Sequence, residues 1–183
     1  MIIVEGPDGS GKTTLIRQLQ ERWPELEVAP RVVSKDAEAM VDLRQWVDDN
    51  LAEGFQYKIF DRHRLISEFI YGPLLRDAQQ PGFTDMTNVY HWMNRMAQIQ
   101  PVIIYCIPPL EIVRANVLRD VENKVVHNRI DGMYTAYVHR AAIDLTGGIF
   151  NTIVYDYTQP GEDSVAIFTP FINYAKGRAD LGF

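Results

Sequence analysis

Short apolar runs alternate along the chain with longer stretches whose apolar residues recur at helical spacing. Runs with the length and composition of buried strands lie at residues 1–5, 27–33, 56–61, 101–107 and 150–156. The stretches between them predict helices at about 12–23, 36–52, 63–77, 85–99, 108–120, 131–145 and 163–176. Strands that alternate with helices are typical of a parallel sheet. We therefore expect an α/β fold: one doubly wound domain with a five-stranded parallel sheet and helices on both faces.

Proline and glycine residues refine this pattern. Pro30 places the second strand at a sheet edge or a bulge, because proline has no amide hydrogen for a central ladder. The pair Gly72-Pro73 predicts a break or kink in the helix over 63–77. Pro108-Pro109 opens the helix predicted at 108–120, since proline is tolerated in a first helical turn.

Composition bounds the kind of protein that this chain can be. Its 183 residues, 46% of them apolar and 23% charged, are ordinary for a single globular domain spanning 1–183. The net charge of −6 gives no overall signal for nucleic-acid binding. The single cysteine, Cys106, excludes an internal disulfide, and its apolar surroundings VIIYCI predict a buried, inert thiol. No apolar run reaches about 18 residues, so we expect no membrane segment, and the lone cysteine favours a reducing, cytoplasmic location.

Residues 6–13, GPDGSGKT, match the phosphate-binding pattern G-x-x-x-x-G-K-[ST] and lie between an apolar strand and an amphipathic helix. Glycines allow a loop whose backbone amides point at phosphates, and the helix N-terminus adds its positive dipole end. We expect the Lys12 ammonium to bridge the β- and γ-phosphates and the Thr13 hydroxyl to bind Mg²⁺. The predicted ATP site consists of Gly6, Gly9, Ser10, Gly11, Lys12, Thr13 and Thr14.

A second polar motif, DRH at 61–63, follows the third predicted strand. Ligands of open α/β sheets collect at the carboxyl ends of the strands. Asp61 is placed like a Walker-B aspartate that faces Mg²⁺ or its waters, and Arg62 can neutralise an attacking or leaving phosphate. This pair favours phosphate transfer over plain nucleotide binding.

Several motifs taken together resemble the thymidylate kinases. EGPDGSGKTTL has an acidic residue inside the phosphate-binding loop, as those enzymes do, and DRH resembles their D-R-[YH] motif. QPVIIYCIPPLEIVRANV resembles the family's fourth strand and following helix, and YTAY at 134–137 resembles the helix after the family's lid. The likeness extends from residue 2 to about 157. The acidic loop and DRH together narrow the resemblance from P-loop proteins in general to nucleoside and nucleotide kinases.

The resemblance implies roles for individual residues. Asp8 would meet the sugar hydroxyl of the acceptor or position the waters of Mg²⁺, and Asp61 would be the metal-side or base-like carboxylate. Arg62 would contact the acceptor and the transferred phosphate. Residues 119–131 would form a lid that closes over ATP and excludes water. Such enzymes are commonly dimers, so a homodimer is possible here. The basic residues of the expected lid are Arg119, Lys124 and Arg129.

The region that would hold the acceptor departs from the family pattern. Only about 47 residues separate Thr14 from Asp61, fewer than in thymidylate kinases, and the family's thymine-holding Phe and Arg have no convincing counterpart. Ser67 and Tyr71 lie at slightly different offsets from the family's serine and tyrosine, and Glu68 is an unusual acid at its place. The candidates for binding the acceptor are Asp8, Arg62, Ser67, Glu68 and Tyr71.

Three functions are compatible with these motifs. The first is an ATP-dependent deoxynucleoside monophosphate kinase with a thymidylate kinase-like layout. The second is a related kinase that phosphorylates a hydroxymethylated pyrimidine, such as 5-hydroxymethyluridine, within DNA; Asp61, Glu68 or Asp8 would then take the hydroxyl proton. That substrate calls for an open basic groove. The third is a regulatory nucleotide-binding module, against which DRH argues. Candidates for the groove are Lys58, Arg62, Arg64, Arg76 and Arg95.

Overall fold

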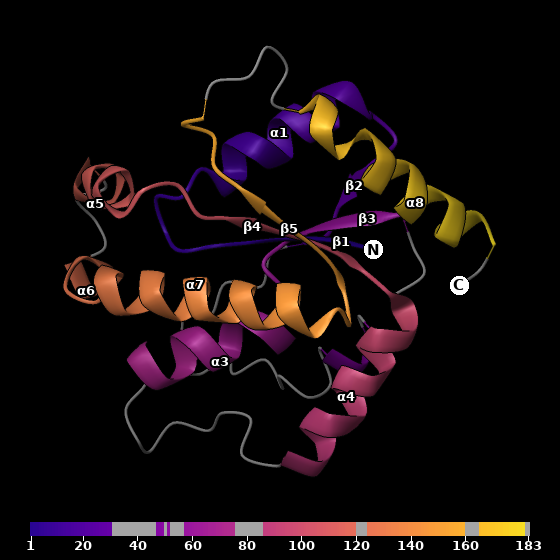
Figure 1. Cartoon of the computed structure of the whole chain (residues 1–183), viewed down its shortest axis with the longest axis horizontal. Helices are drawn as coiled ribbons and strands as arrows, with labels where there is room; N and C mark the ends of the chain where they lie inside the picture. The colour runs from indigo at the N-terminus through magenta and orange to yellow at the C-terminus, as the bar shows by residue number, and fades with distance from the viewer. Residues whose placement is uncertain are drawn as a thin grey trace.

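The computed structural model describes residues 1–30, 47–49, 51, 57–75, 86–119, 124–159 and 165–181. These residues form a five-stranded sheet with helices on both faces (Figure 1). The strands are β1 (Ile2–Glu5), β2 (Glu27–Val28), β3 (Lys58–Asp61), β4 (Val102–Cys106) and β5 (Asn151–Tyr155). All four strand pairings are parallel, so the predicted α/β fold class is confirmed.

The strands follow one another in the order β2-β3-β1-β4-β5, which places β1 in the centre. In the register of β1, Ile2 lies opposite Ile59 of β3 and Val102 of β4. The carboxyl ends of the parallel strands therefore meet at one edge of the sheet, where ligands of open α/β folds bind. The edge position of β2, just before Pro30, confirms the prediction drawn from that proline.

The helices divide between the two faces of the sheet, with α1 and α8 on one face and α3, α4 and α7 on the other (Figure 1). A short 3₁₀ helix, Ala166–Phe168, leads into α8. The helices are α1 (Lys12–Arg22), α3 (Arg64–Leu75), α4 (Met86–Ile99), α5 (Leu110–Arg119), α6 (Lys124–His127), α7 (Ile130–Gly147) and α8 (Thr169–Asp180).

Two apolar cores separate the layers. Ile2 and Val4 of β1 belong to the core shared with α1 and α8, whereas Ile3 belongs to the core shared with α3, α4 and α7. Successive side chains of a strand point to opposite faces, so a strand covered on both sides is apolar throughout. The four residues of β1 are all buried, and this includes the last one, Glu5.

Some sequence-based predictions need correction. Of the break or kink expected at Gly72-Pro73, the break is wrong, because α3 continues through both residues to Leu75. Pro73 is exposed and lies within the last turn, where water can hydrate the backbone that proline leaves without a helical partner. The helix expected over 36–52 lies mostly outside the described residues, although 47–49 and 51 are helical.

Two predictions from composition can be compared with the structure. Cys106 is a buried free thiol, and burial raises its pKa to about 12, as expected for an inert residue. None of the helices within the described ranges combines the length and the apolar character that crossing a bilayer requires.

Candidate active site

The phosphate-binding loop leads from β1 into α1 and depends on glycine for its shape. Gly6 and Gly9 have φ values of 146° and 75°, which side chains with a Cβ rarely adopt. A Cβ on Gly6 would lie 2.5 Å from the Cys106 carbonyl oxygen, and one on Gly9 would lie 2.9 Å from the Val113 carbonyl oxygen. The loop therefore packs closely against β4 and α5, and larger residues at these positions would displace it.

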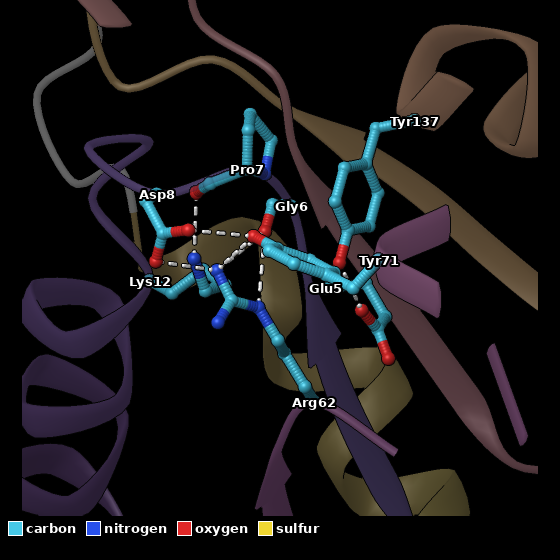
Figure 2. A network of polar contacts seen from close by, with 8 residues as sticks. All are labelled: Glu5, Gly6, Pro7, Asp8, Lys12, Arg62, Tyr71 and Tyr137. Carbon is cyan, nitrogen blue, oxygen red and sulfur yellow. Dashed lines mark hydrogen bonds and ion pairs between the residues drawn. The ribbon is translucent and has the colours of Figure 1, made fainter. Parts of the chain in front are cut away.

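Lys12, the first residue of α1, has a buried side chain whose ammonium donates to the Pro7 carbonyl oxygen at 2.7 Å (Figure 2). Burial and the nearby Arg62 guanidinium lower the pKa of Lys12 to about 8, while Asp8 and Asp61 raise it. A buried ammonium is stabilised by an anion that replaces lost hydration. The environment of Lys12 therefore fits a phosphate ligand.

A cavity of about 580 Å³ opens in front of the loop, a size common for small-ligand sites. Thr13 and Thr14 are exposed at the N-terminus of α1, where unpaired backbone amides favour anions. Asp61, at the end of β3, also lines the cavity and could supply a carboxylate oxygen to Mg²⁺. Of the residues predicted to hold ATP, those that line the cavity are Gly9, Gly11, Lys12, Thr13 and Thr14.

A left-handed turn after β3 directs Arg62 at the loop. Arg62 has a φ of 68°, which is uncommon outside glycine, while its amide still donates to the Val4 carbonyl oxygen at 2.9 Å. Its Nη2 donates to Asp8 Oδ1 at 2.9 Å and to the Tyr71 hydroxyl at 2.6 Å (Figure 2). Nη2 also lies 3.3 Å from the Gly6 carbonyl oxygen. Strained backbone of this kind is often found at functional sites.

Asp8 accepts hydrogen bonds on both carboxylate oxygens. Arg62 binds Oδ1, and the Tyr71 hydroxyl donates to Oδ2 at 2.8 Å. Burial raises the pKa of Asp8, but Arg62, Lys12 and the two hydrogen bonds outweigh burial and bring the pKa to about 2. Asp8 is thus ionised at neutral pH and suited to accept hydrogen bonds. A carboxylate with so low a pKa is a weak general base.

Tyr71 completes this cluster of three side chains. Its ring centroid lies 4.6 Å from the Arg62 Cζ, so the guanidinium stacks on the ring in addition to its hydrogen bond with the hydroxyl. Burial raises the pKa of the Tyr71 hydroxyl, which therefore stays protonated and can donate to Asp8. The structure brings together three of the five predicted acceptor-binding residues: Asp8, Arg62 and Tyr71.

The other two acceptor candidates lie deeper in the molecule. Ser67 and Glu68 are each 4% exposed, one helical turn before Tyr71, and neither is among the residues that line the cavity. The Glu68 carboxyl folds over the backbone of Gly72, where a Cβ would lie 2.7 Å from its Oε1. Glycine at this position thus leaves room for the buried acid.

The arginine residues of the expected lid lie outside the cavity. Arg119 ends α5 and Arg129 precedes α7, and both are exposed. Arg129 lines a second cavity of about 590 Å³, which it shares with residues of α3 and α7. Residues 120–123 and the Lys124 side chain are outside the described part of the chain. Closure of a lid over ATP stays a prediction.

Asn116 and Tyr157 are among the cavity residues that the sequence analysis did not predict. Asn116 of α5 donates to the Gly9 carbonyl oxygen and to the Tyr157 hydroxyl, each at 2.9 Å. The Tyr157 ring lies over Gly11, where a Cβ would come within 2.9 Å of it. Asn116 and Gly9 are 107 residues apart along the chain, and no local pattern announces such a contact.

No protein-family model matches the chain, and no curated protein matches it in sequence. Solved structures of the same shape do exist. The YorR protein of Bacillus subtilis, crystallised in complex with phosphorylated GDP, is similar with a TM-score of 0.70 and 16% identity over 96% of both chains. A deoxyadenosine kinase from M. mycoides with bound dCTP has a TM-score of 0.59 and 14% identity, over 95% of this chain and 100% of the other. At such identities the likeness establishes the fold alone, a parallel α/β fold shared with these two structures, and does not single out thymidylate kinases.

Proposed function

We propose that the chain is an ATP-dependent phosphotransferase that moves the γ-phosphoryl group of ATP to a deoxynucleotide. The observation that carries this proposal is the cluster of Asp8, Arg62 and Tyr71 beside the Lys12 ammonium. A module that only binds ATP has no need for a guanidinium, such as that of Arg62, held in place beside the phosphate-binding loop. A kinase needs such a group to stabilise charge on the phosphoryl group during transfer.

The donor side of the site fits Mg²⁺ and a triphosphate. Thr13 and Asp61 are the oxygen ligands that would hold the metal, which neutralises phosphate charge when bound. Lys12 and the amides at the start of α1 would hold the phosphate groups. Because the Lys12 side chain is already enclosed, its charge acts in a region of low dielectric, where electrostatic stabilisation is strongest.

The acceptor side positions a hydroxyl or phosphate oxygen. Arg62 is 13% exposed in its side chain, so little water screens the guanidinium. The Asp8 carboxylate would accept a hydrogen bond from the acceptor and keep Arg62 aligned. Two proteins of similar shape support a nucleoside or nucleotide acceptor: one is a deoxyadenosine kinase, and the other was crystallised with phosphorylated GDP.

A small acceptor is favoured over a base within DNA. Arg62 is enclosed and paired with Asp8, which is unlike a residue of an open groove. Lys58 is the first residue of β3 and Asp61 the last, so Lys58 lies at the amino end of the strand, away from the end that carries Asp61. Arg76 is outside the described residues. The net charge of −6 also disfavours a polyanionic substrate.

Transfer of labelled γ-phosphate from ATP to a panel of acceptors tests the proposal. The panel contains each deoxynucleoside monophosphate, each deoxynucleoside, and DNA with and without hydroxymethyluracil. We expect label in a deoxynucleoside diphosphate and none with Lys12→Ala, which lacks the phosphate-binding ammonium. Label only in a nucleoside monophosphate would change the acceptor to a nucleoside, and label only in the polymer would support the DNA-base kinase. Binding of ATP without transfer to any acceptor would indicate a nucleotide-binding module.

A further inference from the structure

Glu5 is a fully buried carboxyl group at the junction of β1 and the phosphate-binding loop. One oxygen, Oε1, accepts a hydrogen bond from the His63 backbone amide at 2.8 Å. The other, Oε2, accepts one from the Tyr137 hydroxyl at 3.0 Å (Figure 2). Burying a carboxyl group is costly unless it serves specific partners. The partners of Glu5 lie in the turn between β3 and α3 and on α7, so its side chain joins the end of β1 to both of these segments.

The contact with His63 lies where the β1–β3 ladder ends. Val4 is paired with Asp61, and the Arg62 amide still donates to the Val4 carbonyl oxygen. At the next step the backbone has turned away through the left-handed conformation of Arg62. The Glu5 side chain takes the place of the missing strand partner by accepting the His63 amide. The turn at Arg62 is therefore bounded on one side by a backbone bond and on the other by Glu5.

The contact with Tyr137 links the same turn to α7. The Tyr137 ring also packs edge-on against Tyr71, with 6.1 Å between the ring centroids. Tyr71 in turn holds Arg62 and Asp8 through its hydroxyl. Arg62 is thus fixed twice: its backbone through Glu5, and its guanidinium through a tyrosine that Tyr137 supports.

We infer that Glu5 is a positioning residue, whose carboxyl group holds the turn that presents Arg62 to the transferring phosphoryl group. Tyr137 shares this role by anchoring the Glu5 carboxyl group to α7. The inference rests on the proposed function, because it assigns Glu5 to the alignment of the residue that stabilises the transferred charge. Glu5 itself has no access to a substrate, since its side chain is 0% exposed.

Glu5→Ala and Glu5→Gln separate alignment from charge. Glutamine keeps both links, because its carbonyl oxygen can accept the His63 amide and its amide nitrogen can donate to the Tyr137 oxygen. Alanine removes both. Since a misplacement near 1 Å costs up to about 10²-fold in rate, we expect kcat of Glu5→Ala to fall by about that factor. The KM for ATP should change far less, and Glu5→Gln should restore most of kcat.

Tyr137→Phe and Tyr105→Phe form a matched pair of controls. The Tyr105 hydroxyl donates to Asp144 Oδ2 at 2.6 Å, so it too is a buried bond between tyrosine and carboxylate that ties the sheet to α7. This bond involves neither Arg62 nor Asp8, and it leaves both hydrogen bonds of Glu5 in place, although Tyr105 lies opposite Glu5 in the β1–β4 pairing. We expect a similar loss of thermal stability in both variants, but a fall in kcat, by about tenfold or less, in Tyr137→Phe alone. Equal losses of kcat in the two variants would overturn the inference.

A readout that needs no acceptor keeps this inference separate from the proposed function. The Nε–Hε signal of Arg62 in ¹⁵N NMR spectra should be sharp and slow to exchange in the wild type and Glu5→Gln, and broadened in Glu5→Ala. Folding of each variant is checked by circular dichroism. An unchanged Arg62 signal in Glu5→Ala, or equal damage in Glu5→Gln, would refute the role of Glu5. Absence of transfer by the wild type would refute the kinase alone.

Discussion

Two sets of arginine residues that the sequence assigns to one reaction have contrasting surroundings. Arg62 is 13% exposed in its side chain and is held by Asp8 and Tyr71 at the end of β3. Arg119 and Arg129 are exposed at helix ends outside the cavity. A fixed cation stabilises transition-state charge without reorganisation, whereas an exposed one contributes only after a movement brings it close. The comparison predicts graded effects of substitution.

The largest loss is expected when the fixed cation is removed. Arg62→Ala should lower kcat by about 10²- to 10³-fold, the range seen when one preorganised donor is lost from an active site. Arg62→Lys should restore little of this loss, because an ammonium cannot bond Asp8, Tyr71 and Gly6 in the fork geometry of a guanidinium. Steady-state kinetics with saturating ATP measures both variants. Activity of Arg62→Ala within a few fold of the wild type would show that Arg62 takes no part in the reaction.

The second large effect that we expect is a pH dependence of the free energy of unfolding, which arises from Glu5. Burial raises the pKa of Glu5 to about 7 from 4.5, against the opposing effects of His63, Arg62, Tyr137 and Lys12. The stability that this group contributes is thus complete below pH 4.5 and lost as pH rises through about 7. Glutamine has no proton to lose. The free energy of unfolding of Glu5→Gln should therefore gain on the wild type by up to about 3 kcal/mol between pH 5 and pH 8.

Urea unfolding at pH 5, 6, 7 and 8 measures this difference. Tyr105→Phe serves as a control, because it leaves Glu5 and its two hydrogen-bond partners in place, so the gap to the wild type should stay flat over this range. A gap for Glu5→Gln that is equally flat would mean that the carboxyl group is charged throughout this range, with its pKa not raised by burial.

A smaller effect is expected for Asp8→Ala. This variant distinguishes binding of the acceptor from binding of ATP. Asp8→Ala leaves the glycine loop and Lys12 in place but removes one partner of Arg62. The KM for the acceptor should rise by about tenfold, the cost of one charge-assisted hydrogen bond, while ATP affinity changes little. Titration with ATP and kinetics over a range of acceptor concentrations give the two values. Equal losses on both sides would mean that Asp8 only shapes the loop.

The smallest effects belong to the exposed arginines. Arg119→Ala and Arg129→Ala should leave the free energy of unfolding within about 0.5 kcal/mol of the wild type, as is usual for surface positions. If these residues close over ATP, kcat falls by about tenfold or less in each. A loss of kcat as large as in Arg62→Ala would show that the exposed and enclosed sets are equivalent, which contradicts the comparison.

The sequence predicts where the glycine-rich loop, Asp61 and Arg62 lie better than it predicts their surroundings, for a physical reason. The phosphate-binding loop is encoded within eight consecutive residues, 6–13, and a local motif of this kind needs no knowledge of tertiary contacts. Asp61 and Arg62 are predictable because parallel strands end at a common edge. The five-stranded parallel sheet follows from alternation of apolar and amphipathic segments.

The remaining features depend on contacts between distant segments. Tyr137 binds Glu5 across 132 residues, and Asn116 meets Tyr157 across 41. Glu5 reads in the sequence as the last residue of a strand, and nothing nearby reveals its partners. Gly72-Pro73 shows the opposite case, since local propensity predicts a break that the packed helix α3 does not make. Residues 120–123 of the expected lid lie outside the described part of the chain, so the lid stays a prediction.

The partition of labelled γ-phosphate between a nucleotide acceptor and water tests the central claim most directly. Wild-type protein is incubated with labelled ATP, Mg²⁺ and a mixture of deoxynucleoside monophosphates, and the label in nucleotide product is compared with the label in inorganic phosphate. We predict that nucleotide product dominates in the wild type and that this product, rather than hydrolysis, is lost in Arg62→Ala. Release of inorganic phosphate alone, unaffected by Arg62→Ala, would contradict the account.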